Sequence, residues 1–231
     1  MIDRAARAGF AVMLALGMGC ASSDHAHGPS SSMPAAANRD RHGPPDVAGY
    51  IARLEHSSRE GYLPTPRLVE LLQLRGDEHV ADLGCGPGVV TEHLSAALPR
   101  GRVYAVDVEP AQLDRVNARI AAKKLRNVMP VLCTTEDARL AEGSVDGIVV
   151  VDTYHHFDDR VAYLRRLAAA LKPGGFIANV DFKDGKLEVG PPEDHKVRKA
   201  QMLSEFREAG FEVSREVTEF RYHDYVVFRR R

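Results

Sequence analysis

The chain has 231 residues, of which 44% are hydrophobic, and its 31 basic and 32 acidic side chains give a formal net charge of −1. A chain of this length and composition can bury a sizeable core. Because it has no basic excess to neutralise phosphates, the composition argues against a nucleic-acid ligand.

The first twenty residues read as a secretory leader. Arg4 and Arg7 precede an apolar run over residues 10–16, which is too short to span a bilayer, and small residues then precede Cys20. The pattern resembles the lipobox of bacterial lipoproteins, although its leucine lies one position further from the cysteine than usual. We expect residues 1–20 to be a signal peptide and Cys20 to be a lipidated membrane anchor facing the periplasm. The alternative is a mis-assigned start codon, which would leave the protein in the cytoplasm.

Residues 21–45 are rich in Ser, Ala, Pro, Gly and His and lack apolar periodicity, so we expect a disordered linker. His25 and His27 are interpreted as solvated linker residues, and no metal site is predicted. Residues 46–231 are predicted to form one domain. Cys85 and Cys133 are expected to be free thiols rather than a disulfide.

The hydrophobic patterns from residue 46 onward predict alternating helices and strands. Residues 46–62 begin with a helix and either cover a ligand pocket or pack on the sheet edge. We expect Pro110 in the first turn of a helix, and Asp158 or Asp159 as the cap of another. Helices are predicted over 46–59, 67–74, 91–98, from 110 onward, from about 160 to a glycine end at 171–175, and over 197–209. Strands are predicted over 80–83, 103–107, 127–133, 145–152, 176–182, 211–220 and 225–228, the last two joined by a tight turn near His223 and Asp224.

A glycine-rich turn follows the first predicted strand and organises the chain. Gly84, Gly86 and Gly88 recur at every second position, whereas a dinucleotide site requires Gly-x-Gly-x-x-Gly. Such glycines let the backbone turn sharply and let a ligand approach it closely. Asp82, which ends the strand, would repel a pyrophosphate but suits a ligand that carries an ammonium group.

Asp107 ends the second predicted strand, nineteen positions after Gly88, where a carboxylate can accept both hydroxyls of a ribose. This block resembles motif I and the following acidic motif of class I S-adenosylmethionine (SAM) dependent methyltransferases. The pentad Leu-Lys-Pro-Gly-Gly at 171–175 resembles the same family, and the resemblance covers about residues 65–231.

The resemblance implies a Rossmann-like, doubly wound α/β fold, with a mostly parallel seven-stranded sheet that ends in an antiparallel strand pair. It also implies that SAM is the cofactor, with its ribose on Asp107 and its adenine amino group near Asp137 or the neighbouring Glu136. The methionine part of SAM would lie over the turn formed by Gly84, Cys85, Gly86 and Gly88.

Methyl transfer is an in-line displacement, so the protein mainly has to align a nucleophile, which contributes up to ~7–11 kcal/mol. A base adds roughly 10²–10⁴-fold when the nucleophile arrives protonated. In this fold the carboxyl end of the strand over 145–152 faces the methyl group. We therefore expect Asp152 on the cofactor side and Tyr154, His155 and His156 as catalytic candidates. Adjacent histidines on a loop point in different directions, so at most one is expected in the pocket, and His195 is a weaker candidate.

The residues after this strand, Asp-Thr-Tyr-His, differ from the Asn/Asp-Pro-Pro-Tyr of amino-group methylases of nucleic acids and proteins. Too few cysteines remain for an arsenite methylase. We predict a monomeric methyltransferase for a small-molecule or lipid-like acceptor. The alternative is a catalytically inactive SAM-binding module tethered to the membrane, because SAM is made in the cytosol. A nicotinamide oxidoreductase is disfavoured by the glycine spacing and the closing strand pair.

Overall fold

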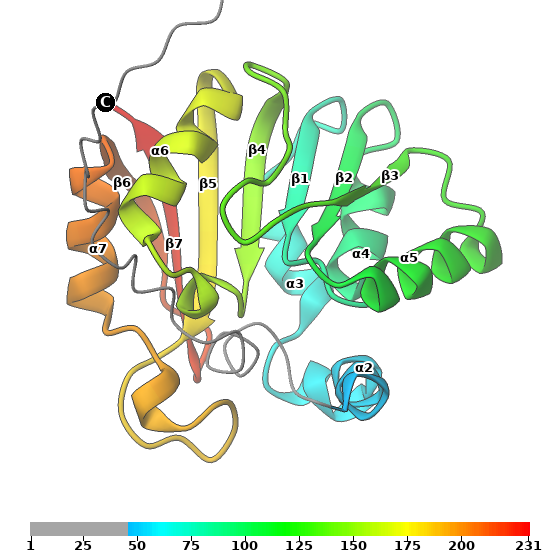
Figure 1. The fold of residues 1–231 in the computed structure, drawn as a ribbon, viewed down its shortest axis with the longest axis horizontal. Helices are drawn as coiled ribbons and strands as arrows, with labels where there is room; N and C mark the ends of the chain where they lie inside the picture. Colours follow the sequence, from blue (N-terminus) through cyan, green and yellow to red (C-terminus); the bar gives the residue numbers. More distant parts are fainter. Residues whose placement is uncertain (1–45) are drawn as a thin grey trace, which may run out of the picture. The chain divides into compact units, whose positions relative to one another are not determined.

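The computed structural model of the protein describes residues 46–231 (Figure 1). The expected signal peptide, the linker histidines and the anchor Cys20 lie outside the described residues. None of the helices within 46–231 is long and apolar enough to cross a membrane.

A seven-stranded sheet with strand order β3-β2-β1-β4-β5-β7-β6 forms the centre of the fold (Figure 1). The first five strands of this order run parallel, and β7 is antiparallel to both β5 and β6. The strands are β1 (His79–Leu83), β2 (Arg102–Asp107), β3 (Val128–Leu132), β4 (Val145–Val151), β5 (Leu171–Phe182), β6 (Phe211–Val217) and β7 (His223–Arg230). The predicted doubly wound sheet with an antiparallel C-terminal pair is confirmed.

Helices cover both faces of the sheet, which explains why β4 is an almost continuous apolar run. Ile148 faces a core that includes Leu164 of α6 and Phe206 of α7. The next residue, Val149, faces a second core with Leu94 of α4. The helices are α2 (Val47–Glu55), α3 (Thr65–Glu70), α4 (Val89–Ala97), α5 (Pro110–Lys123), α6 (Arg160–Ala170) and α7 (Lys199–Glu208), and three short 3₁₀ turns are η1 (Ser57–Gly61), η2 (Tyr154–His156) and η3 (Glu193–His195).

Two predicted helix starts are confirmed. Pro110 occupies the first turn of α5, where its missing N–H removes no helical hydrogen bond. Asp159 caps α6, and its carboxylate accepts a hydrogen bond from the Ala162 N–H at 3.0 Å.

The predicted glycine end of α6 is wrong, because β5 begins at Leu171 rather than at residue 176. Leu171 is already extended and pairs with Val145 of β4. The residue before a proline avoids the helical region, so Pro173 disfavours continuation of the helix through Lys172. The segment therefore joins the sheet as soon as the helix ends.

The predicted tight turn near His223 and Asp224 is also wrong. Both residues lie within β7, where they pair with Phe182 and Asp181 of β5. The Lys183 N–H donates to the carbonyl of residue 222, so the ladder continues past this point. The connection between the two last strands spans residues 218–222 instead.

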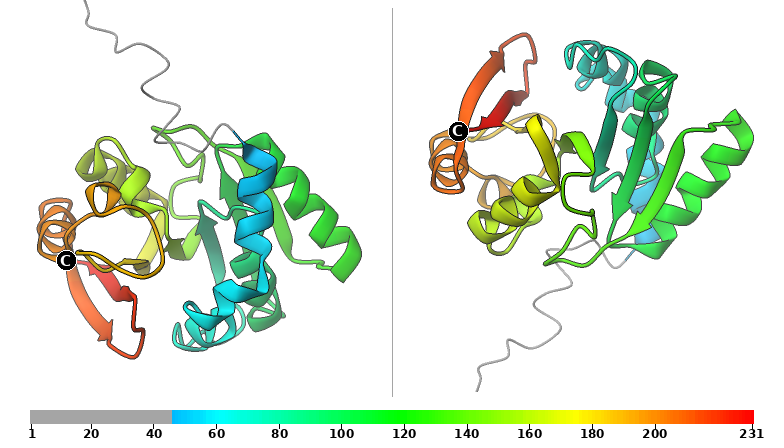
Figure 2. Two further views of the ribbon diagram at one scale, coloured as in Figure 1. Left: turned by 90° about the horizontal axis from the view of Figure 1, so that it is seen from below. Right: turned by 90° about the horizontal axis from the view of Figure 1, so that it is seen from above.

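The segment formed by α2 and η1, residues 47–61, is called the lid below. It lies at the carboxyl ends of the parallel strands, as Figures 1 and 2 show. Its carboxylate at Glu55 accepts hydrogen bonds from Arg115 and Arg119 of α5, at 2.7 and 3.1 Å. Arg59 of η1 donates to Asp152, which directly follows β4. Both ends of the lid are thus tied to the body of the domain.

Candidate functional site

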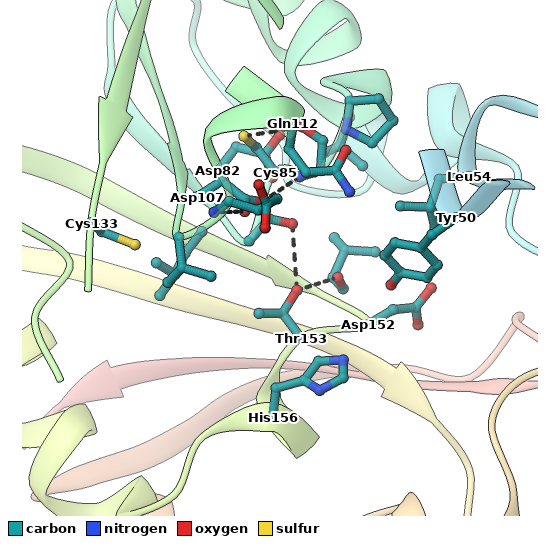
Figure 3. Close-up of a pocket in the computed structure, with 18 of the residues that line it drawn as sticks. Tyr50, Leu54, Asp82, Cys85, Asp107, Gln112, Cys133, Asp152, Thr153 and His156 are labelled. Atoms are coloured by element: carbon teal, nitrogen blue, oxygen red, sulfur yellow. Dashed lines mark hydrogen bonds between the residues drawn. The ribbon is translucent and has the colours of Figure 1, made fainter. Parts of the chain in front are cut away.

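A cavity of about 770 Å³ lies between the lid and the carboxyl ends of β1, β2 and β4 (Figure 3). This volume falls within the roughly 300–1,000 Å³ that small-molecule sites occupy. Val47, Tyr50 and Leu54 of α2 line it. Of the two roles expected for residues 46–62, the structure therefore supports the covering of a ligand pocket.

The glycine turn between β1 and α4 forms one wall of this cavity. Gly84 adopts φ +72°, a left-handed conformation that favours glycine, and its N–H donates to the Val106 carbonyl at 2.8 Å. A Cβ at this position would lie 2.3 Å from the side chain of Thr153. The turn can therefore pack against the loop after β4 only because residue 84 has no side chain.

Asp107 holds the turn from the end of β2. Its carboxylate accepts hydrogen bonds from the Gly86 N–H at 2.8 Å and the Glu109 N–H at 2.9 Å. Burial raises the pKa of Asp107, and the backbone hydrogen bonds oppose this effect. An ionised carboxylate has about four lone-pair sites, so roughly two remain for hydroxyl donors of a ligand. The carboxylate is thus fixed in place with acceptor capacity to spare.

Asp82 ends β1 at the floor of the cavity and is only 1% exposed. Its carboxylate accepts a hydrogen bond from the Thr91 hydroxyl of α4 at 2.5 Å. Burial raises the pKa of Asp82 to about 7. A positive group of a ligand placed beside it would favour the ionised form.

Comparisons with known proteins show what this domain is similar to. Residues 80–175 match the family model described as a methyltransferase domain. Over 123 residues the chain is 31% identical to an uncharacterized methyltransferase of Mycobacterium tuberculosis, covering 53% of this chain and 60% of that relative. It is 26% identical over 166 residues to the uncharacterized methyltransferase YdaC of Bacillus subtilis, covering 72% of this chain and 86% of YdaC.

The fold agrees with a solved structure, that of a SAM-dependent methyltransferase from Aquifex aeolicus. The TM-score is 0.74 at 24% identity, with 78% of this chain and 96% of that chain covered. The chain spans about 60% of the length of the mycobacterial relative it matches. The shared part of the chain includes the glycine turn and Asp107, which lie within the matched residues 80–175.

The cofactor of the methyltransferase domain is SAM, as the sequence predicts. The residues in the cavity fit this group. Asp107 retains acceptor sites for two ribose hydroxyls, and Asp82 can face an ammonium group. Gly86 leaves a space beneath Leu54 of the lid that a side chain would occupy. When bound, SAM supplies an electrophilic methyl group on a sulfonium.

Asp152 lines the same cavity at the end of β4, with an unusual φ of +49°. Its carboxylate accepts from the Arg59 guanidinium at 2.8 Å and lies 3.1 Å from Nε2 of His223. Burial opposes ionisation of Asp152, but the hydrogen bond from His223 and the charges of His223 and Arg59 outweigh it and lower the pKa. Asp152 is therefore an ionised group whose two oxygens both have protein partners.

The structure separates the three catalytic candidates. His156 lines the cavity, as Figure 3 shows, whereas His155 and Tyr154 are not among the lining residues. His155 Nδ1 lies 2.9 Å from the carboxylate of Asp181 on β5. Burial disfavours the charged imidazole, but Asp181 outweighs it and raises the pKa of His155. His155 thus fixes η2 against the sheet.

Tyr154 lies in the core with 1% of its surface exposed. Its hydroxyl donates to Glu205 of α7 at 2.6 Å, and Arg160 pairs with the same carboxylate. Burial and the contact with Glu205 raise the pKa of this phenol, so it is a poor proton donor here. The geometry gives Tyr154 a structural position between η2, α6 and α7.

Glu136 and Asp137, the acids expected near adenine, do not line the cavity, although Thr134 and Thr135 beside them do. The carboxylate of Asp137 accepts from the Arg139 N–H at 2.8 Å, and that of Glu136 accepts from the Thr135 hydroxyl. Their contact with adenine stays a prediction. Gly88 and His195 also fall outside the lining residues.

Cys85 and Cys133 are both free and buried, as the sequence predicts, and both line the cavity. Burial raises the pKa of both thiols, Cys133 to about 12. The two side chains therefore stay protonated and act as apolar parts of the wall.

The lining residues that sequence reasoning did not assign to the site include Tyr50, Leu54, Arg59 and Thr153. For the lid residues, the sequence indicated only that a helix precedes the first strand. Thr153 follows the predicted strand directly, but its hydrogen bonds to the Val151 and Gly84 carbonyls depend on the folded turn. No local pattern points to these contacts.

We expect the affinity for S-adenosylhomocysteine (SAH) to rise with pH between 5.5 and 7.5. Asp82 binds a proton below its pKa of about 7, and an ammonium group beside it would lower that pKa in the complex. Binding below pH 7 then releases a proton, so the affinity increases by up to about tenfold per pH unit and levels off above pH 7. Isothermal titration calorimetry across this range measures the slope.

The matched variant Asp82→Asn cannot titrate at this position, so its affinity should show a flatter pH profile. If the wild type and Asp82→Asn have the same slope, Asp82 does not face the ammonium group of the ligand.

Proposed function

We propose that this protein is a SAM-dependent methyltransferase that acts on a small-molecule or lipid-like acceptor. The observation that carries the proposal is the extent of the cavity, which runs from Asp107 and the glycine turn to His156 and Phe157. The end near Asp107 suits the ribose of the cofactor. The end near His156 leaves room for an acceptor beside it, under the same lid.

Each part of the cavity has a task in this reaction. The lid, through Tyr50 and Leu54, excludes water and holds the two ligands together, so that alignment supplies most of the catalysis. His156 is the one catalytic candidate that lines the cavity, and its imidazole would take the proton of a hydroxyl, phenol or thiol acceptor. The carboxylate of Asp152 is fixed by Arg59 and His223 and stays ionised in the same cavity.

The remaining expectations stay proposals. Anchoring to a membrane through Cys20, the monomeric state and the exclusion of nucleic acid from the acceptors rest on the sequence.

The test begins with ligand-dependent melting of the purified protein. SAH should raise the melting temperature and NAD should not. Turnover of labelled SAM is then measured over a panel of hydroxyl, thiol and amine acceptors. If SAH stabilises the protein but no acceptor is methylated, the inactive binding module is the better reading.

Two histidine variants then locate the base. We expect His156→Ala to lower the rate by roughly 10²–10⁴-fold for an acceptor that carries a proton, with little change in SAH affinity. A base must be neutral, so the wild-type rate should rise through the region where model imidazoles titrate, near ~6.5. His155→Ala should instead lower the melting temperature, because Asp181 would lose the imidazole and keep only backbone N–H donors. Equal rates and pH profiles in wild type and His156→Ala would leave alignment alone as the source of catalysis.

A further inference from the structure

Arg59 is the one lysine or arginine among the described residues that line the cavity. It comes from η1 of the lid, and only 12% of its side chain is exposed. The acidic side chains that line the same space are Asp82, Asp107, Glu109 and Asp152. A partly buried cation at this place is therefore the natural partner for an anionic group of a ligand.

The guanidinium of Arg59 is mostly unused by the protein. Its Nη2 donates one hydrogen bond to Asp152 at 2.8 Å, and within residues 46–231 no second acceptor is recorded. A guanidinium has five N–H donors, so about four remain. None of the free nitrogens of Arg59 is a buried atom without a partner, and the residue lines the cavity. A ligand with acceptor oxygens can therefore reach these donors from the cavity.

The contact with Asp152 also fixes the orientation of Arg59. The second oxygen of Asp152 is held by His223, a fully buried ring that stacks with Tyr62 and packs at a tilt against Phe182. The carboxylate is thus a rigid support, and it neutralises part of the charge of the guanidinium without covering its other edge. A planar fork that is held in this way loses little entropy when it binds a second oxyanion.

We propose that Arg59 is the carboxylate-binding residue of the cavity, engaging a ligand carboxylate through the guanidinium donors that Asp152 leaves free. A carboxylate matches the planar fork with two parallel hydrogen bonds. A dianionic phosphate would be repelled more strongly by the acidic groups around the cavity. Two ligands of the proposed function can carry this carboxylate: the methionine part of SAM, and the methyl acceptor itself.

The first arm of the test asks whether the carboxylate belongs to the cofactor. Calorimetry compares SAH with S-adenosyl-3-thiopropylamine, which lacks only the carboxylate, on the wild type and on Arg59→Gln. If the cofactor is the source, Arg59→Gln should weaken SAH by about 10- to 100-fold and leave the decarboxylated analogue almost unchanged.

The second arm asks whether the carboxylate belongs to the acceptor. The protein is saturated with SAH and titrated with short aliphatic carboxylates and with the matching primary amides. If the acceptor is the source, the wild type should bind a carboxylate at least about tenfold more tightly than its amide, and Arg59→Gln should lose this preference.

Two further variants serve as controls. Arg59→Lys keeps the charge but not the fork, so it should recover part of the lost affinity, and it serves if Arg59→Gln does not fold. Arg115→Gln removes an exposed ion pair that ties the lid to α5 through Glu55 but does not line the cavity. It should leave all these affinities unchanged.

The proposal is overturned if Arg59→Gln changes neither the preference for SAH over its decarboxylated analogue nor that for carboxylates over amides. It is also overturned if Arg115→Gln causes the same losses, because loosening of the lid would then explain them. The inference rests on the proposed function for the identity of the two ligands. All its measurements are of binding, so a lack of turnover counts against the proposed function alone.

Discussion

Replacing Gly86 with valine is expected to abolish SAH binding while the sheet stays folded. Gly86 adopts φ +53°, and its N–H donates to Asp107. A Cβ there would lie 3.3 Å from Leu54 of the lid, so the two methyl groups of a valine would fill the space between the turn and the lid. A β-branched residue in the left-handed region also costs about 1–2 kcal/mol, which favours a flipped turn. Calorimetric titration with SAH measures the effect.

Gly143→Val is the matched control. Gly143 has nearly the same conformation, with φ +58°, but a Cβ there meets nothing within 4 Å. This variant carries the same backbone strain outside the cavity, so it should lose some stability and keep its affinity for SAH. Circular dichroism checks that both variants are folded. Normal SAH binding by folded Gly86→Val would show that the turn does not contact the cofactor.

Asp107→Ala is expected to weaken SAH binding by about 10- to 100-fold. The side chain would no longer accept the two ribose hydroxyls, and the net cost of losing these charge-assisted hydrogen bonds is roughly 1.5–3 kcal/mol. The loss is increased because the N–H groups of Gly86 and Glu109 would have no acceptor, which loosens the turn itself. Calorimetry gives the affinity, and thermal melting gives the stability.

Two variants separate the two contributions. Asp107→Asn keeps an acceptor oxygen for one of the backbone donors but loses the charge, so its affinity should lie between those of wild type and alanine. Asp77→Ala removes an exposed carboxylate that pairs with Arg75 on the surface, and it should bind SAH normally. An Asp107→Ala protein with wild-type affinity would remove this residue from the ribose site.

The part of the cavity formed by the glycine turn and Asp107 could be predicted from the sequence, because its signals are local. The strand, the glycine turn and the helix follow one another within about twenty residues, and Asp107 ends the next apolar run. Backbone freedom at Gly84 and the burial of short apolar runs act over a few residues, so their pattern is preserved in the linear chain. The parallel sheet follows from the same alternation of strands and helices.

The two predicted boundaries that are wrong, the end of α6 and the turn before β7, depend on the pairing of strands rather than on local conformational preference. Leu171 joins β5 because it meets Val145 on a neighbouring strand, and His223 joins β7 because it meets Phe182. In the first case, Pro173 followed by two glycines suggested the end of a helix. In the second case, the polar residues His223 and Asp224 suggested a turn. Long-range hydrogen bonds in the ladder outweighed these local signals.

The sequence by itself determined the fold class and the glycine turn that lines the cavity, because both depend on local periodicity and on glycines at fixed spacing. The tertiary structure alone decided which side chain after β4 faces the cavity. His156 lines it, while His155 bonds to Asp181, 26 positions away, and Tyr154 bonds to Glu205, 51 positions away. It also decided the place of Arg59, whose partner Asp152 lies 93 positions along the chain. The direction of a side chain in a loop is set by the buried partners that satisfy its polar atoms, and chain folding brings those partners together only in three dimensions.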